Sequence, residues 1–279
     1  MSKYHTADNL YVDNVTLMVK DIDKSLKFYT ESLGLTLLNN KSNIYELGTK
    51  KRVLVILIHN ENALPKERTT GLYHFALLLP DRRFLGQLIN HFIVINQKIV
   101  GGSDHDVSEA LYLSDPDGNG IEIYADRLDT LWKYENDEIV MSTEAMDYED
   151  LIKHAYNAKW TEMPEDTVMG HVHFHVTSLI NAGNFFIDTL GFNQMLYYGT
   201  SALFLSNKGY HHHVGLNTWN GVTAKNRADN MVGLVGYHLN VPKDEEEALL
   251  ERISFSKREI LNDENGRYIV DVNKVKIYF

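Results

Sequence analysis

The chain has 279 residues, 44% of them hydrophobic, and its 27 Lys and Arg stand against 38 Asp and Glu, a formal net charge of −11. This acidic balance argues against nucleic acids and anionic membranes as partners. With no cysteine, the chain cannot form disulfides or zinc–thiolate sites. Its start lacks the apolar run of a signal peptide, and no stretch approaches the roughly 18 apolar residues of a membrane helix. We therefore expect a cytoplasmic protein, and leave open whether it is a homo-oligomer; the acidic balance says nothing about a small substrate.

A strand followed by an amphipathic helix occurs twice in clear form. Residues 14–19 (NVTLMV) and 171–176 (HVHFHV) are typical strands, and the segments after them, 19–35 and 176–192, align without a gap. Each of these segments contains a polar turn, a helix with two adjacent aromatic residues (Phe28-Tyr29 and Phe185-Phe186) and a Leu-Gly end. We expect both aromatic pairs in the core and Gly at the helix end.

Three short strands are predicted after each helix. They are TLLNN, NIYEL and RVLVILI after the first, and QMLYYG, ALFLS and HHHVGLN after the second. Two weaker copies fill the gaps: one covers residues 73–92 and 109–127, with two strands about a DPDGNG turn, and the other begins at residue 235 and ends in YIVDVNKVKIYF. We therefore expect an α+β fold of four βαβββ units. Two units lie in an N-terminal half (1–127) and two in a C-terminal half (167–279), joined by an acidic linker (128–166).

Four βαβββ units, with helices ending in Leu-Gly and a DPDGNGIE turn, resemble the vicinal oxygen chelate superfamily. Glyoxalase I, fosfomycin-resistance proteins and extradiol ring-cleaving dioxygenases belong to it, and the resemblance covers nearly the whole chain. It implies that the units pair into cupped sheets. It also implies one divalent metal, held by residues on the first and last strands of the units.

The resemblance also implies a ligand set. In the family the first-strand ligand lies five residues before the last apolar residue of that strand, which gives Asn14, His74, His171 and Gly236 in the four units. The last-strand ligand is the acid of the GNGIEIY pattern, which is Glu122 in the second unit, whereas the fourth unit has Lys276 there. The implied metal ligands are His74, His171 and Glu122. His173 and His175 lie on the same strand face as His171 and compete with it.

These three ligands gather at one site only if the second unit faces the third, because pairing of the first with the second would split them between two cups. We therefore expect units two and three to share the metal site and units one and four to pair with each other. Two histidines and one carboxylate favour Fe(II), with Mn(II) as the next choice, and Zn or Ni would suit a glyoxalase-like enzyme.

The histidine triplet at 211–213 resembles a second family feature. Extradiol dioxygenases carry a His-His-x-apolar-small motif on the last strand of the unit with the first histidine ligand, which places His212 as the acid–base histidine. They also carry a Tyr ten residues before the ligating Glu, here Tyr112, and a His shortly before that Tyr. His105 is near this position but outside the family spacing. His211 and His213 are expected on the other sheet face or beside the pocket. Alternatively, the triplet supplies a fourth metal ligand or belongs to a surface strand.

The resemblance implies an Fe(II)-dependent extradiol dioxygenase, which cleaves a catechol-type diol with O₂ to a muconic semialdehyde-type product. His212 would exchange a proton with the substrate, and Tyr112 would hydrogen-bond the developing ketone oxygen. Two alternatives stay open: a glyoxalase-like lyase or isomerase in the same cup, and a small-molecule-binding module of the resistance type. The ring substituents of the substrate are not set by the sequence.

Overall fold

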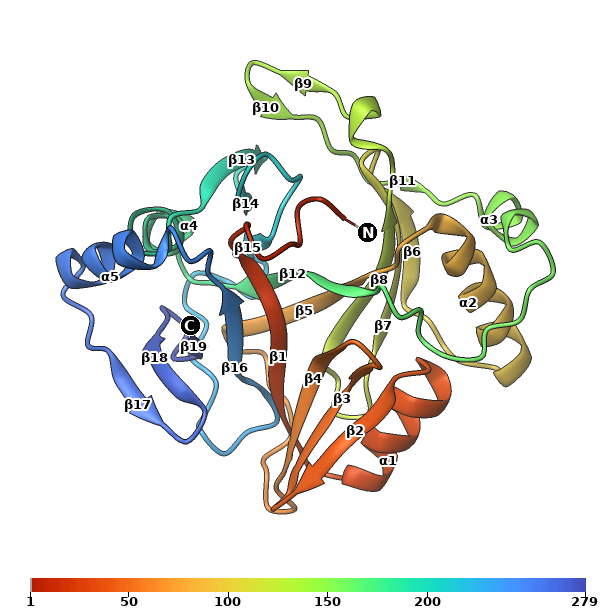
Figure 1. The fold of residues 1–279 in the computed structure, drawn as a ribbon, viewed down its shortest axis with the longest axis horizontal. Helices are drawn as coiled ribbons and strands as arrows, with labels where there is room; N and C mark the ends of the chain where they lie inside the picture. The colour runs from red at the N-terminus through yellow and green to blue at the C-terminus, as the bar shows by residue number, and fades with distance from the viewer. Residues whose placement is uncertain (1) are drawn as a thin grey trace.

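Two large mixed β-sheets form the body of the protein, and the helices lie around them, so the fold class is α+β (Figure 1). The computed structural model describes residues 2–279, and Met1, the first residue of the expected N-terminal half, lies outside the described residues. The sheets combine parallel and antiparallel neighbours and curl around the interior, which is the architecture expected from the family resemblance.

The larger sheet contains nine strands. From one edge to the other they are β11 (Glu144–Ala145), β6 (Gly101–Asp104), β7 (Ser108–Ser114), β8 (Gly120–Asp126), β5 (Gly71–Leu78), β12 (Val168–His175), β15 (Val214–Asn217), β14 (Ala202–Ser206) and β13 (Asn193–Tyr198). Strands from 71–126 and from 168–217 thus lie in one sheet, joined by the antiparallel pair of β5 and β12.

The second sheet contains eight strands. Their order is β17 (Leu261–Asp263), β18 (Gly266–Val270), β19 (Lys276–Tyr278), β16 (Gly233–Asn240), β1 (Tyr11–Val19), β4 (Arg52–His59), β3 (Ile44–Thr49) and β2 (Thr36–Lys41). Its central pair, β1 and β16, is antiparallel, as β5 and β12 are. Each strand of these two pairs has a parallel neighbour on its other side. In the eight-stranded sheet β4 lies beside β1 and β19 beside β16, and in the nine-stranded sheet β8 lies beside β5 and β15 beside β12.

The helices are short and have recognisable ends. They are α1 (Ile22–Lys27), continued by the π-helical η1 (Phe28–Ser32), α2 (Arg82–Ile95), the 3₁₀ turn η2 (Asp129–Leu131), α3 (Tyr148–His154), α4 (Leu179–Asn184), continued by the π-helical η3 (Phe185–Leu190), and α5 (Glu246–Phe255). The side chain of Asp81 caps α2 by accepting from the Arg83 N–H, and Asn96 ends this helix in a left-handed conformation. Among residues 2–279, no helix is long and apolar enough to cross a membrane.

Both aromatic pairs are buried, as the sequence indicated, and both begin a π-helical turn. The two rings of each pair meet edge to face, with centroids 5.2 Å apart in Phe28-Tyr29 and in Phe185-Phe186. They belong to one apolar core that fills the space between the sheets, where Phe174 of β12 contacts Tyr237 of β16. This core covers one face of the nine-stranded sheet, and a smaller apolar cluster that includes Leu78, Tyr124 and Tyr210 lies apart from it.

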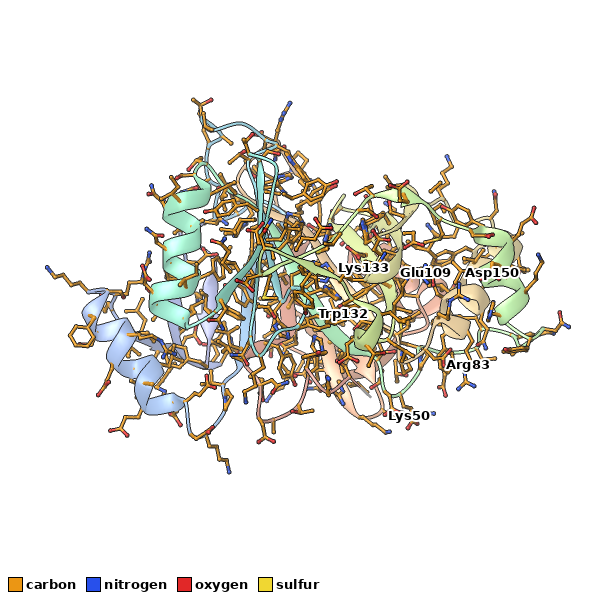
Figure 2. The ribbon with its side chains drawn as sticks, turned by 90° about the horizontal axis from the view of Figure 1, so that it is seen from above. Lys50, Arg83, Glu109, Trp132, Lys133 and Asp150 are labelled. Atoms are coloured by element: carbon orange, nitrogen blue, oxygen red, sulfur yellow. The ribbon has the colours of Figure 1, made fainter. Side chains whose placement is uncertain are left out.

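Arg82 ties helices α2 and α3 to β7 through ion pairs with Glu109 and Asp150. The guanidinium of Arg82 donates to both carboxylate oxygens of Glu109, over 2.7 and 2.8 Å, and to Asp150 over 2.9 Å. Glu109 is almost completely buried. Figure 2 shows Glu109 and Asp150 on the same side of the molecule.

The linker segment 128–166 contains η2, α3, β11 and the small hairpin of β9 (Tyr134–Glu135) and β10 (Glu138–Ile139). One predicted strand differs from its expected form. The predicted strand HHHVGLN begins only at Val214, so the histidine triplet lies in the connection before β15. Side chains in a connection do not alternate between two faces, and this is why the three histidines do not follow the expected alternation.

Candidate metal centre

Three neighbouring strands bring His74, Glu122 and His171 together. In the sheet register Ala76 of β5 lies directly between Glu122 of β8 and His171 of β12, and His74 lies two residues before Ala76 on the same face. The donor atoms form a triangle: His74 Nε2 is 3.1 Å and His171 Nε2 is 3.2 Å from Glu122 Oε2, and the two Nε2 atoms are 3.3 Å apart. All three side chains are buried. The small methyl of Ala76 leaves room for this convergence.

The triangle fits three ligand atoms on one face of an octahedral ion. Ligands at about 2.1 Å from such an ion lie about 3 Å apart when adjacent, and the three donor–donor distances differ little from this value. His74, Glu122 and His171 are the residues of 2–279 that gather as a potential metal-binding group. They leave the remaining side of an ion open to the cavity.

The charges of these groups also suit a cation. Burial opposes ionisation of Glu122, but interactions with His171 and His74 outweigh it and hold the pKa of the carboxyl well below its usual range. Burial lowers the pKa of His171 to about 4, against the opposing effect of Glu122. A carboxylate beside a neutral imidazole is the protonation state in which both bind a metal. His171 Nδ1 is buried and has no hydrogen-bond partner among residues 2–279.

The turn between β7 and β8 positions Glu122. Asp115 Oδ1 accepts from the N–H groups of Asp117 and Asn119, and Asp115 Oδ2 accepts from the Asn119 amide and, over 2.9 Å, from the Tyr29 hydroxyl. Gly118 has φ of +84°, a conformation that glycine adopts easily. The DPDGNG motif is therefore a rigid turn anchored to the first helix.

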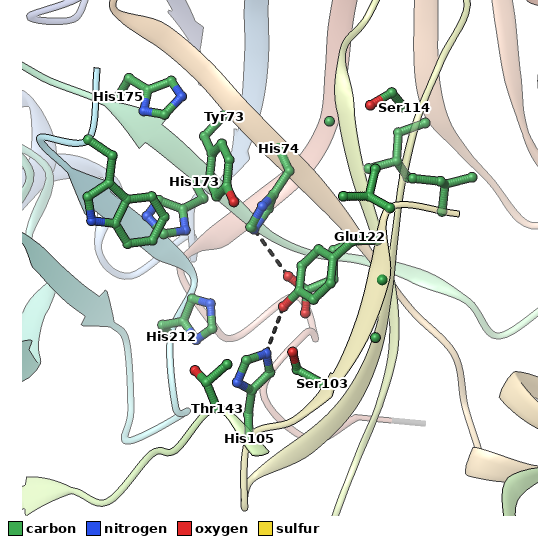
Figure 3. A pocket seen from close by; sticks show the side chains of 18 of the residues that line it. Tyr73, His74, Ser103, His105, Ser114, Glu122, Thr143, His173, His175 and His212 are labelled. Atoms are coloured by element: carbon green, nitrogen blue, oxygen red, sulfur yellow. Dashed lines mark hydrogen bonds and ion pairs between the residues drawn. The ribbon is translucent and has the colours of Figure 1, made fainter. Parts of the chain in front are cut away.

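A cavity of about 570 Å³ opens beside the triangle (Figure 3). Its walls are mainly aromatic and apolar, and they include Tyr73, Phe204 and Trp219. His74, Glu122 and His212 line it as well, and so do Tyr112 and His105. A volume of this size accommodates a small organic ligand.

Tyr112 and His105 form a hydrogen-bonded pair at the cavity wall. His105 Nδ1 is 2.7 Å from the Ser142 carbonyl, which can only accept, so this nitrogen carries the proton and Nε2 accepts from the Tyr112 hydroxyl over 2.7 Å. Burial and the charge of Glu122 hold the pKa of Tyr112 well above its usual range. His105, which lies outside the family spacing, thus contacts the predicted tyrosine directly.

Of the three histidines of the triplet, His212 lines the cavity, whereas His211 and His213 lie behind its wall. His212 lines the cavity, and its ring is 4.0 Å from the ring of His171, centroid to centroid. His211 contacts His212 and Asp126. His213 is buried against the N-terminal segment, where its Nε2 donates to the Tyr4 carbonyl over 3.2 Å.

The competing candidates are placed differently. His173 and His175 line the cavity but are joined through Asn217, whose amide donates to His173 Nε2 over 3.0 Å and whose oxygen accepts from His175 Nδ1 over 2.6 Å. In the other sheet, Lys276 pairs with Asp263 over 2.7 Å. Neither His173 nor His175 belongs to the triangle.

Sequence reasoning missed one polar residue of this region, Asp126. It follows Glu122 and Tyr124 at intervals of two along β8, and this spacing puts all three on one face of the strand. The spacing of two residues was visible in the sequence. It does not identify the partner of Asp126, because His211 lies 85 residues away along the chain.

The mixed α+β fold and the potential metal-binding triangle in a cupped sheet define the class of protein, and the comparisons identify the same family. The chain belongs to the Glyoxalase/Bleomycin resistance protein/Dioxygenase superfamily, whose family model matches residues 11–123. A relative from Bacillus subtilis (strain 168), named Catechol-2,3-dioxygenase, is 42% identical over 274 residues, covering 95% of this chain and 94% of the relative.

Solved structures show the same fold at low sequence identity. A putative dioxygenase from Bacillus subtilis has a TM-score of 0.62 at 13% identity, covering 96% of this chain and 83% of that chain. Glyoxalase I from Zea mays has a TM-score of 0.57 at 17% identity, covering 99% and 94%. At these identities the likeness concerns the fold alone.

Proposed function

We propose that this protein is an Fe(II)-dependent extradiol dioxygenase, which cleaves a catechol-type diol with O₂ to a muconic semialdehyde-type product. The observation that carries the proposal is the buried triangle of His74, Glu122 and His171 at the wall of a cavity that also contains His212 and Tyr112. The relative named Catechol-2,3-dioxygenase, at 42% identity, supports it.

The proposal includes the organisation of the fold. The unit of β5–β8 and the unit of β12–β15 share the metal site, and the unit of β1–β4 pairs with that of β16–β19. The N-terminal half (1–127) and the C-terminal half (167–279) each contribute one unit to each pair. The site therefore needs both halves of the chain.

His74, His171 and Glu122 would hold the metal, with Fe(II) preferred and Mn(II) next. When bound, Fe(II) supplies the electron transfer that a direct reaction of O₂ with a closed-shell aromatic ring lacks. The aromatic walls of the cavity orient the ring of the diol and exclude water from it.

The protein groups around the cavity manage protons. Burial and the neighbouring histidines hold the pKa of His212 well below its usual range, so its ring is neutral and can take a proton from a substrate hydroxyl. His212 returns this proton to the departing oxygen when the ring opens. The Tyr112 hydroxyl donates a hydrogen bond to His105, so the Tyr112 oxygen is oriented to accept a hydrogen bond from the substrate. Rotation of this hydroxyl then lets Tyr112 donate to the developing ketone oxygen.

The test is reconstitution under anaerobic conditions with Fe(II), followed by addition of catechol and O₂. We expect one O₂ consumed for each semialdehyde formed, measured with an oxygen electrode and by absorbance. His212→Ala should keep the metal and lose about 10²-fold or more in kcat. Glu122→Ala should lose the metal, measured by elemental analysis.

Three results would contradict the proposal. They are a reconstituted protein that consumes no O₂ with any of several catechols, a His212→Ala variant with the wild-type rate, and turnover of methylglyoxal with a thiol in the Zn or Ni form. The last result would instead support a glyoxalase-like lyase. Tight binding of a catechol without turnover would point to a binding module.

A further inference from the structure

A chain of hydrogen bonds leads away from His212 on the side opposite the cavity. His212 Nδ1 is 2.8 Å from His211 Nδ1, and His211 Nε2 is 2.9 Å from Asp126 Oδ1. His211 is completely buried, His212 is 6% exposed, and the Asp126 side chain is 20% exposed. The function proposed above uses only the first member of this chain.

Asp126 marks the outer end of the chain. It lines a second cavity, of about 290 Å³, together with Tyr4 and Trp132. The Tyr210 hydroxyl also donates to Asp126 Oδ1, over 3.2 Å, and holds the carboxylate in place. The three residues thus connect the cavity beside the metal triangle to a second cavity in contact with water.

The hydrogen-bond partners of His211 and His212 determine which ring nitrogen of each histidine carries a proton. A carboxylate can only accept, so His211 carries its proton on Nε2, and the Nδ1 of a neutral His211 is an acceptor. The 2.8 Å contact between the two Nδ1 atoms needs one proton, which His212 Nδ1 must supply. His212 Nε2 is then unprotonated. This nitrogen has no hydrogen-bond partner among residues 2–279, and its ring lines the cavity.

We propose that Asp126 and His211 are positioning residues that hold His212 in the tautomer whose unprotonated Nε2 faces the cavity, and that they receive the proton charge when His212 acts as a base. The proton of a substrate hydroxyl forms a bond to His212 Nε2, and the Nδ1 proton of His212 passes to His211 Nδ1. The O–H bond of the substrate breaks, and the products are a substrate oxyanion, a neutral His212 with an Nε2 proton and a cationic His211 paired with Asp126.

This transfer conserves protons and moves the positive charge away from the metal triangle. A cationic His212 would lie against His171, where a bound divalent ion would repel it. A cationic His211 instead lies 2.9 Å from a carboxylate. The reverse transfer restores the proton to the cavity when His212 acts as an acid. The catalytic part of this inference rests on the proposed function, whereas the tautomer does not.

The first test measures the tautomer in the metal-free protein. Long-range ¹H–¹⁵N correlation spectra of protein labelled with ¹⁵N-histidine distinguish an Nδ1 proton from an Nε2 proton, and His212→Asn assigns the signal. We expect the Nδ1-protonated form in the wild type and a shift toward the Nε2-protonated form in Asp126→Asn, because an amide can donate to His211 Nε2. A wild-type His212 protonated on Nε2, or no change in Asp126→Asn, would overturn the inference.

The second test measures catalysis with catechol in the Fe(II) form. Asp126→Asn should lower kcat on the order of 10- to 100-fold, with metal content and KM unchanged. His211→Gln should keep the His212 tautomer, since an amide donates to Asp126 and accepts from His212, but it should lose rate because it cannot take the proton. The control is Asp129→Asn, which removes a carboxylate that pairs with Lys3 and Tyr4 and does not contact His211.

The results separate the two proposals. An Asp126→Asn or His211→Gln variant with wild-type kcat would overturn the proton transfer even if ring cleavage occurs. A wild type that shows the expected tautomer but cleaves no catechol would contradict the proposed function and leave the tautomer assignment standing. Circular dichroism melting of each variant checks that the fold is retained.

Discussion

Asp271 lies in the turn before β19, at the position that corresponds to Asp115 before β8, and its environment makes a strong prediction. Asp271 Oδ1 accepts from the N–H groups of Asn273 and Val275, each over 2.8 Å. Its Oδ2 is buried and has no hydrogen-bond partner in the described part of the chain, whereas the corresponding oxygen of Asp115 accepts from Tyr29 and Asn119. Burial raises the pKa of Asp271 from 3.8 to about 7, against the opposing effect of these backbone hydrogen bonds.

The sign of the effect on stability follows from linkage. The folded state holds the Asp271 proton more tightly than the unfolded state, so its contribution to stability is complete below pH 3.8 and is lost as the pH rises to about 7. At about 1.4 kcal/mol for each unit of pKa, the loss between these limits is about 4 kcal/mol. Asp271→Asn keeps both backbone hydrogen bonds but cannot ionise, so it should not lose this stability.

The assay is urea unfolding of wild type and Asp271→Asn at several values between pH 4 and pH 8. We expect the difference in unfolding free energy to change by about 4 kcal/mol in favour of the variant across this range. Titrations of all other groups cancel in the difference. Asp263→Asn, in the same sheet, is the control: interactions with Lys276 and Tyr278 outweigh its desolvation and lower its pKa, so it should gain nothing at pH 8. Parallel curves for wild type and Asp271→Asn would refute the reasoning.

Two further predictions concern the ion pair of Glu109 and the metal centre. Glu109→Ala should lower the unfolding free energy by about 2 kcal/mol, because it removes a buried carboxylate that Arg82 binds at two points. Glu162→Ala, which breaks an exposed pair with Lys50, should cost about 0.5 kcal/mol or less in the same urea assay, and equal costs would contradict the burial argument. Mn(II) at about 100 times its dissociation constant should raise the unfolding free energy by about 2.7 kcal/mol, reversibly on adding a chelator. The same ion concentration should have little effect on Glu122→Gln, and equal stabilisation of both proteins would place the ion elsewhere.

The sequence by itself determined the features that depend on near neighbours along the chain. The repeated strand–helix pattern, the burial of the two aromatic pairs and the DPDGNG turn follow from local periodicity and turn chemistry, which act over a few residues. Membership of the superfamily follows from the same motifs. The positions of His74 and His171 within their strands are local too, because each is counted from the end of its own strand.

Only the tertiary structure decided how these local pieces meet. The antiparallel pairing of β5 with β12 sets the 3.3 Å approach of His74 to His171, and no short-range rule determines which strands become neighbours. The triplet lies before β15 rather than in it, so His211 lies beside His212 instead of on the opposite face. The bond from His211 to Asp126 joins residues 85 positions apart. Such contacts depend on the packing of the whole chain, because their partners are close in space and remote in sequence.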